Sequence, residues 1–575
     1  MTTAPTPSLE PMSPAPPAPR EEWARQLARI VRVARKTHAV GDFPLTEAFA
    51  AARVAASHGL NAGMLHALHA STHPARVAIV DARRSLTYAD ANAEINQLAN
   101  ALRATAALSP GDAIAIAIEN RAEYLVAWFA AMRLGVRVVH AGSHATAEEL
   151  LHMARRSGAR VFIASDATIA AARVVQAQLP ERDVRIVTCS PLVPRDGERS
   201  YESLVENGDT RFPSTNGARG ESVVFTSGTT GAPKGALRDF SVFGPQELAR
   251  ILDRLPLAFG DRHLVAGPLH HSAPQIFALL HSALGGTLYL SPRFDAEATL
   301  RALSERRIHS VFLVPTMLRR ILDLPETVQR AAPTPELRAV IVGSSEFGHD
   351  LRREAIARFG PRHVFDFYGA TELGWVTLVR GDEMLARPGT VGRPLAGQEV
   401  RILDDRGTAL PPRVPGVIAV RNAQTMLGYV RDARATEDAR RGEWCTVEDI
   451  GWLDGDGYLY LSGRAQDMVK SGGVNVYPAE VERVLAEDPQ VREVAVIGVP
   501  DREWGERLVA VVVPKSGAFD PASAKNRARV RLSPAKVPRE WHAIEELPRN
   551  ANGKVLKAQL RAMFAPPAAS ANRAS

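Results

Sequence analysis

The sequence predicts an α/β protein in which a large N-terminal domain of mixed, largely parallel sheets carries a β-rich subdomain and precedes a small α+β C-terminal domain. Amphipathic stretches such as residues 120–134 alternate with short apolar runs such as Val161-Phe162-Ile163, which is the pattern of βαβ units. After about Gly389 the strands follow one another closely, as in EVRILDDRG and GYLYLSGR. A smaller module, with the helix PAEVERVLAE followed by the strands VREVAVIG and RLVAVVVP, begins near Asp467.

Changes in composition predict the domain boundaries. Residues 1–20 are rich in Pro and Ala and should form a disordered leader, and residues 566–575 a disordered tail. Between them we expect the large domain over residues 21–466 and the small domain over residues 467–565. The leader lacks the apolar centre of a signal peptide, and no apolar run approaches the roughly 20 residues that cross a bilayer. We therefore expect a cytoplasmic protein.

Charge and cysteine content limit which classes of partner and which kinds of structural site we expect. The 70 basic residues face 63 acidic ones, and the net charge of +7 is spread without a long basic run. An anionic small ligand or an arginine-biased genome explains this balance as well as nucleic acid does, and we expect no nucleic-acid partner. Cys189 and Cys445 are the two cysteines of the chain, which indicates neither a disulfide framework nor a zinc site.

The stretch FTSGTTGAPKG, residues 225–235, combines glycines, hydroxyl side chains and one lysine after a β-branched run. Such a loop turns backbone N–H groups toward one point and suits a polyanion such as phosphate. It differs from the G-x-x-x-x-G-K-[ST] loop because Gly235 follows Lys234 and Pro233 precedes it. On these residues alone, a phosphate loop and a polar connection between two strands remain equally good interpretations.

The loop is the first of an ordered set of motifs. Downstream of it follow PLHHSAP (268–274), VPTM (314–317), VGSSE (342–346), DFYGATELG (366–374), EDIGWLDGDGYLYLSGR (448–464), MVKSGGVNVYPAEVE (468–482) and PRNANGKVLK (548–557). Their order and spacing resemble the adenylate-forming superfamily of acyl-CoA synthetases, adenylation domains and luciferases over residues 86–561. Within it, PLHHSAP and GGVNVYPAEVE look most like bacterial fatty-acyl-CoA synthetases.

The resemblance implies an ATP-dependent acid–CoA ligase that acts on a medium- or long-chain fatty acid, with ATP, Mg²⁺ and CoA as cofactors and cosubstrates. The acid would first become an acyl-AMP, with release of pyrophosphate, and then pass to the thiol of CoA. Two alternatives stay open, an acyl-AMP ligase that loads an acyl carrier protein and a noncatalytic nucleotide-binding relative. The sequence does not define the acyl chain or the oligomeric state.

The resemblance also implies site residues, carried over by motif position. Glu372 would bind Mg²⁺, Thr371 the α-phosphate and Asp449 the ribose hydroxyls, with Arg464 as a second nucleotide contact. Tyr368 would lie against the adenine and Asp366 would accept its amino group. The remaining nucleotide contacts are the loop residues Thr226, Ser227, Gly228, Thr229, Thr230, Gly231 and Lys234, the adenine-lining residues Gly343, Ser344, Ser345 and Glu346, and Gly369.

The last set of residues belongs to the acyl and thiol side of the reaction. His271 would border the acyl site, in competition with its neighbour His270. Lys554 would bridge the carboxylate and the α-phosphate in the first reaction. The small domain is implied to be mobile, rotating about a hinge at Gln466 so that Gly472 and Gly473 line the pantetheine path.

The segment EEWARQLARIVRVARK, residues 21–36, precedes the resemblance. On a helix it has an apolar stripe and a basic back, which suits either peripheral contact with the inner face of the membrane or docking on the large domain. We favour docking on the large domain, because most amphipathic helices of soluble proteins pack their apolar face against the protein.

Overall fold

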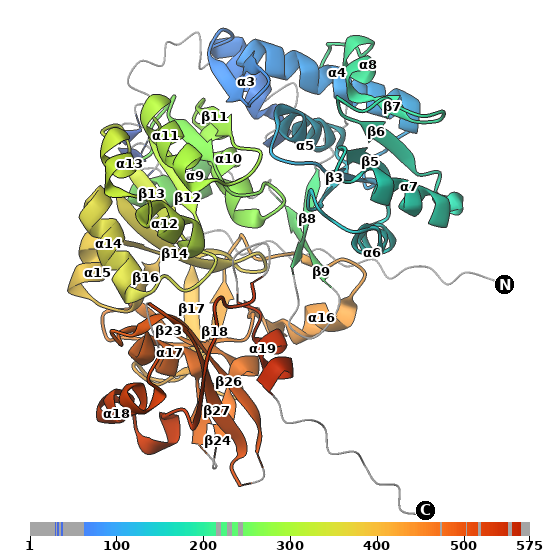
Figure 1. Ribbon diagram of the computed structural model, residues 1–575. Helices are drawn as coiled ribbons and strands as arrows, with labels where there is room; N and C mark the ends of the chain where they lie inside the picture. Colours follow the sequence, from blue (N-terminus) through green and yellow to red (C-terminus); the bar gives the residue numbers. More distant parts are fainter. Residues whose placement is uncertain are drawn as a thin grey trace, which may run out of the picture.

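A computed structural model describes residues 29, 32–33, 36–37, 62–213, 220–226, 233–239, 245–471, 474–501, 503–515, 519–549 and 555–564. It confirms the predicted class, with a large N-terminal part built on two sheets and a smaller C-terminal domain on a third (Figure 1). The predicted leader and tail lie outside the described residues, and the boundary at residues 466 and 467 stays a prediction.

The first sheet runs from a parallel half into an antiparallel half. The strand order β2-β1-β11-β10-β12-β13-β14 is parallel apart from β2, and from β14 onward β15, β16, β23, β22, β18, β21 and β20 pair antiparallel, with β17 beside β18. The second half is the β-rich subdomain predicted after Gly389. The bounds of these strands are β1 Val77–Val80, β2 Ser85–Thr87, β10 Arg262–Val265, β11 Thr287–Leu290, β12 Ser310–Leu313, β13 Ala339–Val342, β14 Val364–Ala370, β15 Gly374–Arg380, β16 Thr390–Pro394, β17 Glu399–Leu403, β18 Gly416–Arg421, β20 Arg440–Arg441, β21 Trp444–Cys445, β22 Asp449–Leu453 and β23 Leu459–Arg464.

The second sheet has the order β19-β9-β8-β4-β3-β5-β6-β7, and the third the order β25-β24-β27-β26 with β28 beside β27. The strands of the second sheet are β3 Ala113–Ala117, β4 Arg137–His140, β5 Ala159–Ala164, β6 Arg185–Thr188, β7 Arg199–Ser200, β8 Glu221–Thr226, β9 Lys234–Asp239 and β19 Gly428–Tyr429. Those of the third are β24 Val469–Ser471, β25 Val474–Val476, β26 Val491–Asp501, β27 Gly505–Pro514 and β28 Glu540–Ala543.

The helices begin where the sequence supplies caps. Thr87 with Asp90 and Thr146 with Glu149 form capping boxes at the starts of α4 and α6. α5 is buried along its whole length within a core that residues from both large sheets share. The α-helices are α3 Leu65–Thr72, α4 Tyr88–Ala106, α5 Ala122–Leu134, α6 Ala147–Ser157, α7 Ile169–Gln178, α8 Tyr201–Glu206, α9 Pro245–Arg254, α10 Ser272–Ala283, α11 Ala296–Glu305, α12 Pro315–Leu322, α13 Glu326–Ala331, α14 His349–Phe359, α15 Gly381–Ala386, α16 Ala433–Asp438, α17 Pro478–Ala486, α18 Pro521–Arg531 and α19 Lys557–Phe564.

The described residues of segment 21–36 dock on the large domain. Arg29 and Arg32 pair with Asp253 at 3.9 and 3.1 Å, and the Lys36 ammonium donates to backbone carbonyls at the C-terminal end of α9. Cations are favoured there because helix C-termini carry partial negative charge. Val33 is buried in the core. At these positions the basic side of the segment contacts protein, which favours the docking interpretation. None of the described helices combines the length and the apolar character that crossing a membrane requires.

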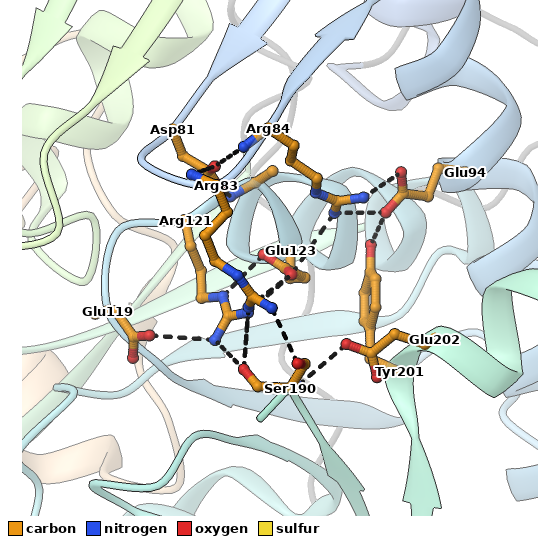
Figure 2. Close-up of polar contacts among 11 residues, drawn as sticks. Asp81, Arg83, Arg84, Glu94, Glu119, Arg121, Glu123, Ser190, Tyr201 and Glu202 are labelled. Atoms are coloured by element: carbon orange, nitrogen blue, oxygen red, sulfur yellow. Dashed lines mark hydrogen bonds and ion pairs between the residues drawn. The ribbon is translucent and has the colours of Figure 1, made fainter. Parts of the chain in front are cut away.

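A buried ion network ties the turn between β1 and β2 to the start of α5 and to the loop after β6 (Figure 2). Arg121 donates to both oxygens of Glu123, at 2.8 and 2.9 Å, and to the Ser190 carbonyl. Arg84 donates to Glu94, which also accepts from the Tyr201 hydroxyl at 2.6 Å. The network therefore links elements of both large sheets, and within it Arg121 and Glu123 are buried while Arg84 is partly exposed.

We expect Glu123→Gln to lower the free energy of unfolding by about 3 kcal/mol, because the charge of Arg121 stays buried without its carboxylate. The side chains of Arg121 and Glu123 are only 6% and 5% exposed. Glu297→Gln is the matched control, since it breaks the exposed Arg301–Glu297 pair and should cost less than about 1 kcal/mol. Calorimetric melting of both variants checks this, and equal shifts would contradict it.

Candidate functional site

The candidate site is organised by the tight turn that joins β14 to β15. A Cβ on Gly369 would lie 2.3 Å from the carbonyl oxygen of Gly374, so only glycine allows the strands to approach so closely. Gly374 itself has a φ of +74°. Around this turn Tyr368, Thr371 and Glu372 each contact a different part of the large domain.

Glu372 is buried, and its carboxylate accepts two hydroxyl hydrogen bonds on one oxygen. Thr226 Oγ1 lies 3.1 Å and Tyr429 Oη 3.0 Å from Oε1. In the described part of the chain no donor contacts Oε2. A carboxylate held through one oxygen and open at the other fits a hard cation that takes its further ligands from phosphate and water. The described residues contain no cluster of three His, Cys, Asp or Glu side chains that could hold a metal by itself.

Thr226 and Lys234 stand at the two ends of the Gly/Ser/Thr loop. They are cross-strand partners in the β8–β9 hairpin, and the Lys234 ammonium lies 5.4 Å from the ring centroid of Tyr429. The hairpin thus brings both ends of the loop to Glu372. Ser227, Gly228, Thr229, Thr230 and Gly231 lie outside the described residues.

Asp449 is held between a hydroxyl and a guanidinium. The Tyr368 hydroxyl donates to Oδ2 at 2.9 Å, and Arg464 Nε lies 3.1 Å from Oδ1. Burial and the Asp449 charge raise the pKa of Tyr368, so its hydroxyl stays protonated and donates. Three residues that the motifs assigned to one nucleotide therefore lie together, although β14 and β22 are far apart in sequence.

Thr371 connects the turn to α10. Its hydroxyl shares a hydrogen bond of 3.0 Å with Ser272 Oγ, at the first residue of that helix. His271 directly precedes Ser272, and its ring centroid lies 4.0 Å from that of His270. The His270 ring faces Gly142 in the loop after β4. Both histidines therefore lie near Thr371, and the preference for His271 stays a prediction.

Phe277 of α10, Phe312 of β12, Phe367 of β14 and Trp375 of β15 form an aromatic cluster next to the turn that carries Thr371. The ring centroids lie 5.1 Å apart for Phe277 and Trp375, and 5.2 Å apart for Phe367 and Trp375. All four residues are buried. A Cβ on Gly343 would lie 2.5 Å from the Phe367 ring, so the loop after β13 rests directly on the cluster.

The rest of that loop faces the small domain. Ser344 has a φ of 71°, and Ser345 and Glu346 follow it. Although the Glu346 side chain is accessible to solvent, the protein around it and the Glu482 carboxylate raise its pKa. Arg483 and Lys557 of the small domain act in the opposite direction. The predicted adenine loop is therefore within electrostatic reach of α17 and α19.

Asp366 has a partner that the sequence did not reveal. Its carboxylate accepts from Arg352 of α14, which also donates to the Thr390 carbonyl at 2.8 Å. Burial raises the pKa of Asp366 to about 6, and Arg352 opposes this shift. The predicted contact with the adenine amino group would have to share the carboxylate with Arg352.

The predicted hinge lies between two ion pairs. Gln466 belongs to the 3₁₀ turn η4, Ala465–Asp467. Arg464 before it pairs with Asp449, and Asp467 after it pairs with Arg561 of α19 at 2.8 Å. Gly472, Gly473 and Lys554 lie outside the described residues.

Sequence reasoning missed Tyr429, Ser272 and Arg352. Ser272 lies within the PLHHSAP motif, where the two histidines are the candidates, and Tyr429 lies in the largely apolar stretch MLGYV, which matches none of the motifs. Arg352 is one of two adjacent arginines on an amphipathic helix, where a solvated charge is the ordinary interpretation. Their roles follow only from contacts with residues distant in sequence.

Comparison with known proteins gives consistent matches. The model of a family described as AMP-binding enzyme matches residues 67–430, and that of the AMP-binding enzyme C-terminal domain matches residues 480–554. The indoleacetate–CoA ligase of Aromatoleum aromaticum is 33% identical over 86% of this chain and 97% of its own length. The long-chain-fatty-acid–CoA ligase FadD13 of Mycobacterium tuberculosis is 31% identical over 83% of this chain and 93% of its own. The solved anthranilate CoA ligase AuaEII superposes with a TM-score of 0.79 and 25% identity, over 88% of this chain and 97% of its own.

We expect Asp449→Asn to weaken ATP binding by about tenfold or more, because a neutral amide accepts ribose hydroxyls less strongly than a carboxylate does. Tyr368→Phe should have a smaller effect, since Arg464 still orients Asp449. Isothermal titration with ATP measures both variants. Unchanged affinity in Asp449→Asn would remove this residue from the nucleotide site.

Proposed function

We propose that the turn between β14 and β15 is the centre at which this chain, a member of the AMP-binding enzyme family, activates its carboxylic acid. Members of the family form adenylates, and the chain is an acid–CoA ligase that uses ATP, Mg²⁺ and CoA. The observation that carries this proposal is the convergence of Thr226, Tyr368, Glu372 and Asp449 around that turn. The four side chains come from three strands and the turn itself, and they present donors and acceptors suited to one nucleoside triphosphate.

In the first half-reaction a carboxylate oxygen of the acid attacks the α-phosphorus of ATP, and the bond to the pyrophosphate oxygen breaks. Asp449 holds the ribose, while Thr371 contacts the α-phosphate beside the acid. Mg²⁺ bound by Glu372 would offset negative charge on the phosphates when present. Lys234 adds a positive charge at the end of the loop next to the leaving pyrophosphate.

In the second half-reaction the sulfur of CoA attacks the acyl carbonyl, and the bond to AMP breaks. The small domain would rotate about Gln466 between the two steps. In the described arrangement, Arg483 of α17 and Lys557 of α19 lie within electrostatic reach of Glu346, so these two helices of the small domain face the predicted adenine loop.

For the acid we propose an aryl or arylalkanoic carboxylate. Two of the proteins described above are named for indoleacetate and anthranilate, which are aromatic acids. A fatty acid, our expectation from the motifs, is the second candidate, since a relative of similar identity is a long-chain-fatty-acid–CoA ligase.

We expect pyrophosphate exchange to be faster with arylacetic and benzoic acids than with a series of saturated fatty acids. Trp375→Leu should shift the ratio of kcat/KM values toward the fatty acids by about tenfold. The reason is that the substitution removes an aromatic ring directly after the turn and replaces it with a smaller aliphatic side chain. A wild-type preference for long chains would overturn the aryl proposal and leave the ligase assignment intact. Thioester formation with CoA, compared with acyl carrier protein, identifies the acceptor.

Lys554→Ala should depress adenylation strongly and spare thioester formation from supplied acyl-AMP. The reason is that Lys554 is proposed to offset charge only while carboxylate and α-phosphate react. Rates of the two half-reactions, measured separately, check this. Lys536→Ala serves as a control, because Lys536 pairs with Glu480 within the small domain. Equal loss in both half-reactions for Lys554→Ala would contradict the assignment.

A further inference from the structure

Tyr429 is fixed in place by the second sheet. β19 pairs with β9, so that Tyr429 lies opposite Ala236, and the N–H of Val430 donates to the Gly235 carbonyl at 2.9 Å. Its own N–H donates to Thr436 Oγ1 at 2.9 Å. The backbone of Tyr429 is therefore anchored to the strand that begins at Lys234, at the end of the phosphate loop.

The side chain of Tyr429 reaches two groups of the proposed site at once. Its hydroxyl donates to Glu372 Oε1 at 3.0 Å, and its ring lies 5.4 Å from the Lys234 ammonium. Thr226, at the other end of the loop, donates to the same carboxylate oxygen.

We propose that Tyr429 is a positioning residue that couples the phosphate loop to the metal carboxylate. Its hydroxyl, with that of Thr226, engages Oε1 of Glu372 and leaves Oε2 for Mg²⁺, while its ring contacts Lys234 at the other end of the phosphate loop. This inference rests on the proposed function, in which Glu372 binds the metal of Mg–ATP. In this proposal Tyr429 acts through Glu372 and Lys234, and it is given no contact of its own with the reacting atoms.

The two contacts of Tyr429 can be separated by substitution. Tyr429→Phe removes the hydroxyl and keeps the ring beneath Lys234, so the carboxylate loses one of its two donors. Tyr429→Leu removes both contacts. If the hydroxyl positions the metal ligand, its loss must weaken binding of Mg–ATP and leave binding of metal-free ATP unchanged.

The test is calorimetric titration of the full chain with ATP, once with Mg²⁺ and once with EDTA. We expect Tyr429→Phe to weaken Mg–ATP binding by about tenfold, the loss of one hydrogen bond to a charged group, with no change in EDTA. Tyr429→Leu should weaken binding under both conditions because Lys234 loses its ring contact. Thr226→Val, which removes the other donor, should reproduce the metal-dependent loss. Tyr289→Phe, a hydroxyl deletion on β11 away from the site, should match wild type.

The outcomes distinguish this inference from the proposed function. Wild-type Mg–ATP affinity in Tyr429→Phe, or equal loss with and without Mg²⁺, would overturn the coupling. If Glu372→Gln also binds Mg–ATP as wild type does, the metal assignment itself fails. If Glu372→Gln loses Mg–ATP affinity while Tyr429→Phe and Thr226→Val do not, only the positioning role fails.

Discussion

The close approach of Gly369 to Gly374 is the steric constraint on which the candidate site depends. Because these residues carry no Cβ, β14 can turn back as β15 within three residues. Side chains in and beside this turn then reach different parts of the large domain. Tyr368 reaches the β-rich subdomain, Thr371 reaches α10, and Glu372 reaches the second sheet. One turn thus brings together parts of the chain that are otherwise held apart by the core.

The acidic groups around this turn share a common organisation. Glu372, Asp449 and Asp366 are each held by protein donors from another element, so their orientation is settled before a ligand arrives. Preorganised charges of this kind cost little rearrangement when substrate binds. Burying carboxylates stabilises the folded state less than burying apolar groups would, and each of these three needs a donor from another element of the structure.

The sequence was sufficient to predict the class of fold and the motifs, because both depend on local order. The run Val161-Phe162-Ile163 is a buried strand as expected, and the expected helix 120–134 starts at Ala122, with Arg121 before it bound to Glu123. The partners of the carboxylates were not predictable. Tyr429 lies on a two-residue strand whose pairing with β9 spans nearly two hundred residues, and Arg352 resembles any surface arginine. The basic residues of segment 21–36 also suit a membrane surface, although docking is the favoured prediction, and their contacts with α9 support docking.

The ion pairs on either side of Gln466 restrict how the small domain can turn. Arg464 is bound to Asp449 of the large domain, and Asp467 is bound to Arg561 of the small one, with Ala465 and Gln466 between them. If the small domain rotates about Gln466 as proposed, a rotation that preserves both pairs has to occur in the backbone torsions between Arg464 and Asp467. The small domain would then turn about a very short backbone segment while α19 stays bound to Asp467.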